Sequence, residues 1–103
     1  MILTGKLEAE MEIVKRHIHT LSHVMKNQPI GIIKLSQLMD LPEHKVRYSL
    51  RILEQEKMIE PSPEGARATK RAKKEIKEIK KALEKIIADA EEMLHEIDEM
   101  ERM

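Results

Sequence analysis

The last third of the chain restricts the fold most. Residues 70–103 contain no glycine or proline, and their apolar side chains recur at alternating spacings of three and four residues. This heptad pattern predicts one long helix with a single apolar seam, and Thr69 is suited to cap its first turn. At ~1.5 Å per residue the helix is roughly 50 Å long, well beyond the ~13 Å radius of gyration of a domain of this size. We therefore expect a partner helix to cover the seam. Its residues are Ile76, Ile79, Leu83, Ile86, Ala90, Met93, Ile97 and Met100.

The composition favours a mainly α protein. Of the 103 residues, 37% are charged and only one is aromatic, so the core is expected to consist of Leu, Ile and Met. The absence of cysteine excludes disulfides, thiolate zinc sites and cysteine nucleophiles. No apolar run approaches the ~18 residues of a membrane span, and the N-terminus lacks the long apolar stretch of a signal peptide. We expect a soluble cytoplasmic protein without a membrane partner.

The charges are distributed unevenly, although 19 basic side chains balance 19 acidic ones. Residues 13–57 carry eight basic and four acidic side chains, residues 67–85 carry nine and three, and residues 86–103 carry one and seven. The chain thus has a basic body and an acidic end. Because attraction to phosphate depends on the local surface, the zero sum does not exclude a nucleic-acid partner.

Two helices are expected before residue 40. The first begins at Thr4, which is suited to an N-cap, and stops near Asn27 because Pro29 disfavours helix in the residue before it. The second follows Gly31 and leaves Lys34 and Gln37 on its outer side. The apolar stripe of the first helix is Leu7, Met11, Val14, Ile18, Leu21 and Met25, and the inward residues of the second are Ile32, Leu35, Leu38 and Met39.

A third helix follows a tight turn at Asp40-Leu41. Pro42 suits the first position of a helix, where its missing N–H needs no partner, and the helix extends to about Lys57. Apolar residues spaced four and three apart must pack on the second helix, and they are Val46, Leu50 and Leu53. The outer side then carries His44, Lys45, Arg47, Tyr48 and Arg51.

A small hairpin is expected after the third helix. Residues 58–60 and 66–68 are too short to form helices between Pro61, Pro63 and Gly65, so they are predicted to be two paired strands. The chain then divides into a first domain, residues 1–69, and a dimerisation helix, residues 70–103.

The segment from Leu35 to Thr69 resembles the winged helix-turn-helix transcriptional regulators of the ArsR/MarR type found in archaea and bacteria. The resemblance depends on the Leu35-Ser36 start, on Leu41, Val46, Leu50 and Leu53, on Met58-Ile59, and on the wing-like run 61–69. Asp40 stands where these regulators often have glycine, and an acidic residue, Glu64, lies at the wing tip. The expected fold is mainly α, a winged helix-turn-helix with a two-stranded wing and a long C-terminal coiled-coil helix.

The resemblance implies a sequence-specific interface with double-stranded DNA. The helix over residues 42–57 would enter the major groove, where Arg47 and Arg51 are the best candidates for guanine edges. Phosphate contacts would come from Lys34 and Lys45, and the wing contact from Arg67. The full set of expected DNA-binding residues is His44, Lys45, Arg47, Tyr48, Arg51, Lys34, Gln37 and Arg67.

The C-terminal seam predicts a homodimer, which would present two DNA-binding heads to two half-sites. Ile87 and Leu94 widen the seam, so the first helix could also join the cluster. An antiparallel pair is favoured because it sets the basic half of each helix against the acidic half of the other. A parallel pair stays open, since Glu75 would face Glu96 in the simplest antiparallel register. Winged-helix proteins with an antiparallel C-terminal coiled coil are known among archaea, and this chain is similar to them in layout.

Other functions remain open at this point. The outer face of the third helix could bind another protein of a transcription assembly or be an ordinary solvated surface, and the long helix could belong to a structural adaptor. His19 and His23 have a metal-compatible spacing but no acidic or cysteine partner nearby, so neither a metal nor a cofactor is expected. No phosphate loop, catalytic triad or carboxylate pair is recognisable, so we do not expect an enzyme. The sequence specifies neither an operator, nor an effector, nor activation or repression.

Overall fold

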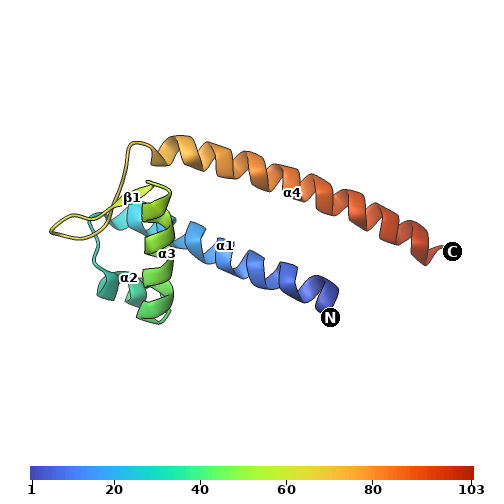
Figure 1. The fold of residues 1–103 in the computed structure, drawn as a ribbon, viewed down its shortest axis with the longest axis horizontal. Coiled ribbons are helices and arrows are strands. Elements are labelled where there is room, and N and C mark those ends of the chain that lie inside the picture. The colour runs from blue at the N-terminus through green and yellow to red at the C-terminus, as the bar shows by residue number, and fades with distance from the viewer. The chain divides into compact units, whose positions relative to one another are not determined.

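The computed structural model describes residues 1–103 and is mainly helical, which confirms the expected class (Figure 1). Four helices and two strands occur in the order α1 (Ile2–Asn27), α2 (Ile32–Met39), α3 (Glu43–Gln55), β1 (Ile59–Glu60), β2 (Arg67–Ala68) and α4 (Ala72–Glu101). The chain divides into two compact units, residues 1–72 and residues 73–103. None of the helices combines the length and the apolar content that crossing a membrane requires.

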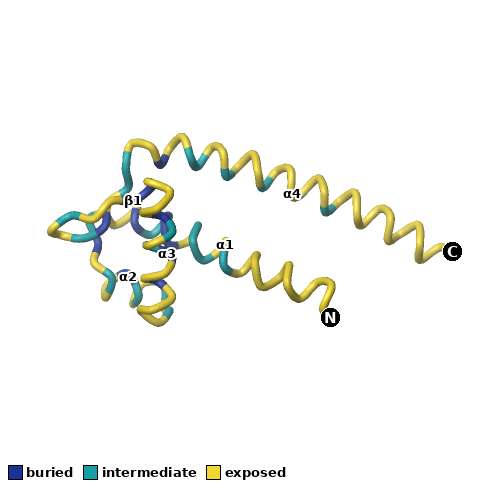
Figure 2. Tube along the Cα trace, viewed as in Figure 1, coloured by how far each residue is buried: buried dark blue, intermediate teal, exposed yellow.

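The core of the first unit lies where α1, α2 and α3 meet. Val24 of α1, Leu35 of α2 and Val46 of α3 are all completely buried. Leu53 and Met58 extend this core toward the sheet and are 4% and 3% exposed. Figure 2 shows the buried positions gathered in this region. Since full burial of one such side chain contributes about 1.5–3 kcal/mol, these contacts hold α3 firmly against the other two helices.

The sheet is the predicted antiparallel hairpin with one addition. Ile59 pairs with Ala68, and Glu60 pairs with Arg67. Ile30, just before α2, forms an isolated bridge with Ala66, in which the two residues exchange hydrogen bonds of 3.1 and 2.8 Å. The hairpin is thereby attached to the connection between α1 and α2, a link that sequence analysis did not foresee.

Several expected helix ends are wrong. α1 begins at Ile2 with Met1 as its N-cap, so Thr4 lies inside the helix. Pro42 is the N-cap of α3, with extended geometry (φ −60°, ψ 146°), rather than its first helical residue. α3 ends at Gln55 because Lys57 adopts a positive φ of 60°. Thr69 does not begin α4, because that helix starts three residues later and the Thr69 hydroxyl donates to the Lys57 carbonyl oxygen at 2.6 Å.

The inward faces of α1 and α2 also differ from expectation. The buried residues of α1 are Thr20, Leu21 and Val24, so of its long apolar stripe only Leu21 lies in the core, with Ile18 half-buried beside it. Four stripe residues are exposed, and they are Leu7, Met11, Val14 and Met25. In α2, Leu38 is 46% exposed, so the expectation that it faces inward is wrong. Both helices carry more apolar surface than the first unit covers.

Candidate nucleic-acid interface

A short turn between α2 and α3 determines where α3 points. Asp40 ends α2 in the left-handed conformation (φ 52°, ψ 47°), which aspartate tolerates better than most residues. The Leu41 N–H donates to the Ser36 carbonyl oxygen at 3.2 Å, and the Ser36 hydroxyl donates to the Leu41 carbonyl oxygen. The turn is therefore closed by hydrogen bonds in both directions, which gives α3 a defined starting direction.

α3 has one buried and one exposed face. Val46, Ser49 and Leu53 are buried against the rest of the unit, and Leu50 is half-buried. The outward side chains that the sequence assigned to DNA are all exposed, namely His44, Lys45, Arg47, Tyr48 and Arg51. Lys34 and Gln37 of α2 and Arg67 of β2 are exposed as well. All eight expected contact residues are thus accessible in the single chain and belong to the same compact unit.

The cations of this surface are not neutralised within the chain. Lys45, Arg47 and Arg51 of α3 make no ion pair with a carboxylate, and neither do Lys34 and Arg67. Ion pairs of 3.0–3.6 Å occur instead on the exposed side of α4, between Lys81 and Glu78, Lys85 and Asp89, and His95 and Glu99. Unpaired guanidinium and ammonium groups can form charge-assisted hydrogen bonds with phosphate oxygens.

α1 supports the exposed face of α3 through a polar contact. The His17 and Tyr48 rings have centroids 5.5 Å apart at an interplanar angle of 52°. Nδ1 of His17 shares a 2.7 Å hydrogen bond with the hydroxyl of Ser49, which is completely buried. Burial, followed by the positive charge of Arg16, lowers the pKa of His17. The lowered pKa favours a neutral imidazole, and this ring lies against the Tyr48 ring from the α1 side.

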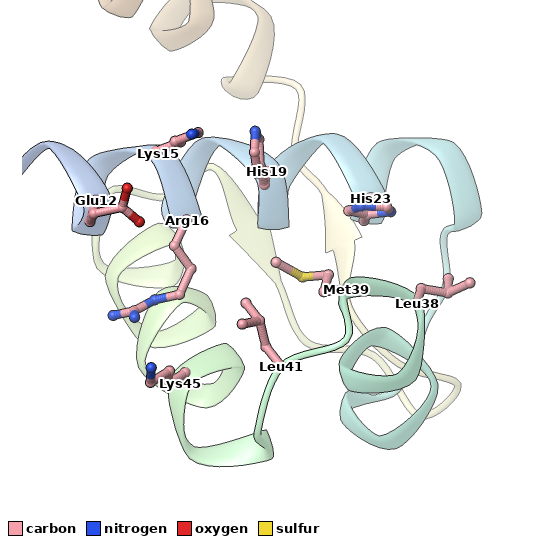
Figure 3. Close-up of a pocket in the computed structure, with 9 residues that line it drawn as sticks. All are labelled: Glu12, Lys15, Arg16, His19, His23, Leu38, Met39, Leu41 and Lys45. Carbon is pink, nitrogen blue, oxygen red and sulfur yellow. The ribbon is translucent and has the colours of Figure 1, made fainter.

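A cleft of about 590 Å³ lies between α1 and the α2–α3 turn (Figure 3). Lys15 and Arg16 of α1 line it together with Lys45 of α3. Sequence analysis missed both α1 residues as candidates, because a basic pair on a charged helix is an ordinary feature until the fold places it beside α3. His19 and His23 also line the cleft, but no group of three or more potential metal ligands exists in the chain.

The expected dimer residues of α4 form a stripe that is only partly covered. Four of them are half-buried, namely Ile76, Ile79, Leu83 and Ala90, and four are exposed by 46–56%, namely Ile86, Met93, Ile97 and Met100. Ile87 and Leu94 lie beside the stripe and are 57% and 61% exposed. An exposed apolar stripe of this kind is typical of a helix surface that packs against another helix.

Compared with protein-family models and with curated proteins, the sequence matches none of them. The functional argument therefore depends on the arrangement of the residues themselves.

Proposed function

We propose that this protein is a homodimeric DNA-binding protein of the winged helix-turn-helix type that regulates transcription. In this proposal α2 and α3 are the helix-turn-helix, the hairpin of β1 and β2 is the wing, and α3 enters the major groove. The observation that carries the proposal is the outward face of α3. Five exposed polar and cationic side chains stand there above a buried face that anchors the helix.

Each exposed side chain has a role that follows from its chemistry. Arg47 and Arg51 present planar guanidinium groups that can pair bidentately with guanine, so they would supply specificity. Lys34 and Lys45 would position the protein on phosphates, which carry no sequence information. Arg67 would contact the backbone from the hairpin.

The dimer of the proposal forms through α4. The uncovered stripe of this helix would pack on the same stripe of a second copy, and two heads on a two-fold axis would bind two half-sites. We favour an antiparallel pair. In that arrangement the basic residues 73–85 of one copy lie beside the acidic residues 86–103 of the other.

Replacing Arg47 and Arg51 together by alanine tests the DNA contact. Loss of two bidentate base contacts, each worth about 1–3 kcal/mol, should weaken specific duplex binding by roughly 30-fold or more. Fluorescence anisotropy on duplexes selected from a random pool measures the affinity. The matched control is Lys6→Ala with Lys26→Ala, which removes the same charge from exposed α1 positions and should bind nearly as the wild type does.

Salt dependence separates this proposal from its main alternative. A protein that displaces phosphate counterions loses affinity for random duplex DNA steeply as salt increases, with a slope of about −0.9 per phosphate contact. A slope near zero, or unchanged affinity in the Arg47 and Arg51 double variant, would contradict the proposal. A flat slope would instead favour a module that binds another protein through α3.

A further inference from the structure

The first half of α4 carries a dense group of lysines on one side of the helix. We call this group the lysine face, and its members, all exposed, are Lys73, Lys74, Lys77, Lys80 and Lys81. Since each residue turns the helix by about 100°, Lys74, Lys77 and Lys81 lie roughly 150° or more from the centre of the apolar stripe. A second helix that packs on the stripe therefore leaves the lysine face accessible.

The lysines of this face are each other's neighbours on the helix surface. Lys73, Lys77 and Lys81 follow one another at intervals of four residues. Lys74 and Lys80 lie three residues before and after Lys77. Side chains three or four residues apart meet on a helix, and like charges at these spacings destabilise it, whereas a solvated helix face commonly alternates the two signs. The arrangement therefore lowers the stability of the free helix, and an anionic partner would relieve the repulsion.

The chain provides little negative charge to this face. Its one ion pair joins Lys81 to Glu78 at 3.6 Å, between side chains that are 74% and 58% exposed, and the other four lysines form none. Most carboxylates of α4 lie instead in residues 86–103, which carry seven acidic side chains and one basic. An antiparallel partner would bring these carboxylates to the edges of the stripe. Lys74 and Lys77, on the opposite side of the helix, would still lack a counter-charge.

The charge density of the lysine face suits duplex DNA. The face is about 12 Å long at ~1.5 Å per residue, and a duplex presents one phosphate charge about every 1.7 Å of its axis. Lysine is a flexible point charge that binds phosphate without distinguishing bases. An anionic membrane surface fits less well, because the apolar stripe on the other side of the helix continues to Met100 through the acidic residues 86–103, which such a surface would repel.

We propose that the lysine face of α4 binds the phosphate backbone of the DNA that α3 binds. This inference rests on the proposed function and adds a contact that carries no sequence information. Ala72, the first residue of α4, is 1% exposed and belongs to the first unit, and the lysine face begins at the next residue. Because the face is joined directly to the unit that carries α3, binding of DNA by α3 raises the local concentration of phosphate around these lysines.

Lys74→Gln with Lys77→Gln tests this contact by fluorescence anisotropy. At about 0.9 per phosphate contact, the double variant should reduce the salt slope on random duplex DNA by about 1.8 and weaken binding about 60-fold at 0.1 M salt. A selected duplex should lose affinity by the same factor, since contacts between lysine and phosphate do not distinguish sequences. The matched control is Lys6→Gln with Lys26→Gln, which removes two exposed charges from α1 and should keep the slope of the wild type.

The results separate the lysine face from the proposed function. Wild-type slope and affinity in the lysine variant, together with a loss in the Arg47 and Arg51 double variant, would overturn the lysine face and leave binding by α3 intact. Equal losses in the lysine variant and its control would also overturn it, because they would reflect net charge rather than this surface. A wild type that binds no duplex would reject both the lysine face and the proposed function.

Stability and assembly of the lysine variant are checked separately. Glutamine removes repulsion between neighbouring lysines, so the Tm should equal or exceed that of the wild type, and sedimentation should be unchanged because both positions lie away from the stripe. A lower Tm or a changed oligomeric state would place these lysines in the protein's own packing and overturn the proposal.

Vesicles made of equal parts of phosphatidylserine and phosphatidylcholine test the membrane alternative. The wild type should bind them weakly, and the lysine variant should differ little from it. Strong binding to vesicles that is lost in the lysine variant, with an unchanged salt slope on DNA, would assign the lysine face to a lipid surface and overturn the DNA contact.

Discussion

Three residues with positive φ set the turns around α3. Asp40 (φ 52°) precedes the helix, Lys57 (φ 60°) follows it, and Gly65 (φ 131°) lies in the hairpin. In the left-handed region an L side chain is strained, and glycine is not. The sequence marks Gly65 and the turn at Asp40, where the resembling regulators often have glycine, but nothing in it marks Lys57, because lysine occurs in many backbone conformations.

Gly65→Ala should be strongly destabilising. A Cβ atom at this position would lie 2.4 Å from the carbonyl carbon of Ile30 and 2.6 Å from its oxygen, in a backbone conformation that alanine already disfavours. We expect a loss of about 2–4 kcal/mol in the free energy of unfolding, measured by urea denaturation. Gly5→Ala is the matched control, since nothing lies within 4 Å of its added Cβ, and it should stabilise α1 slightly. Equal stability of the two variants would contradict the close approach of residues 30 and 65.

Lys57→Gly should stabilise the protein. Lys57 follows the C-cap of α3, where its N–H donates to the Glu54 carbonyl oxygen at 2.9 Å and the Met58 N–H donates to that of Leu53 at 2.9 Å. This pattern prefers glycine at the left-handed position. After allowance for the more flexible unfolded chain, we expect a gain of about 0.5 kcal/mol in urea unfolding. Glu54→Gly, inside the same helix, should instead lower the free energy of unfolding by about 1 kcal/mol. If Lys57→Gly lowered it as well, the left-handed conformation of Lys57 would be contradicted.

At the scale of elements, the packing of α1 against α3 decides how the candidate interface is supported. The spacing of the apolar residues correctly predicted which side of α3 is exposed, because burial of Val46 and Leu53 turns the opposite side of the helix outward. The same pattern could not reveal Ser49 and Thr20, two completely buried polar residues. Their burial is possible because Ser49 bonds His17, and the Thr20 hydroxyl donates to the Arg16 carbonyl oxygen at 2.7 Å.

The His17 contact predicts a pH dependence of stability. The pKa of His17 is lowered from 6.5 in the folded protein, so the unfolded chain takes up a proton at a higher pH than the folded chain does. The free energy of unfolding should therefore fall as the pH drops through 6.5, and it should level off below the pKa of the folded state. Urea unfolding of the wild type and of His17→Gln between pH 8 and pH 5 isolates this contribution. The difference in free energy of unfolding between the wild type and His17→Gln should become smaller as the pH is lowered. A difference that became larger at low pH would contradict a neutral His17 imidazole in the folded protein.

At the scale of the whole molecule, α4 and the first half of α1 leave apolar surface uncovered. Leu7 is 58% exposed on α1, and Ile97 is 49% exposed on α4. The heptad pattern alone predicted a partner for α4. Sequence analysis also allowed the apolar stripe of the first helix to join the α4 cluster, and the exposure of Leu7, Met11 and Val14 leaves that stripe available for such a contact.

Charge placed in the α4 stripe should separate the proposed dimer. Ile79→Asp with Ile86→Asp would bury carboxylates in an apolar contact, which is costly, so sedimentation should show a monomer. The single variants Ile86→Asp and Ala88→Asp form a matched pair. They add the same charge two residues apart, but Ala88 lies outside the stripe and its variant should stay dimeric. A double variant that sediments as a dimer would refute this assignment of the interface.

The sequence by itself determined the helical class, the hairpin and the outward face of α3, because these depend on local periodicity and on breakers such as Pro61 and Pro63. It also determined the apolar stripe of α4. The tertiary structure decided which face of α1 is buried, attached the hairpin to Ile30, and placed Arg16 and Lys45 in the wall of the same cleft. These features join residues far apart in the chain, and they are set by packing and hydrogen bonding between elements, which no local pattern encodes.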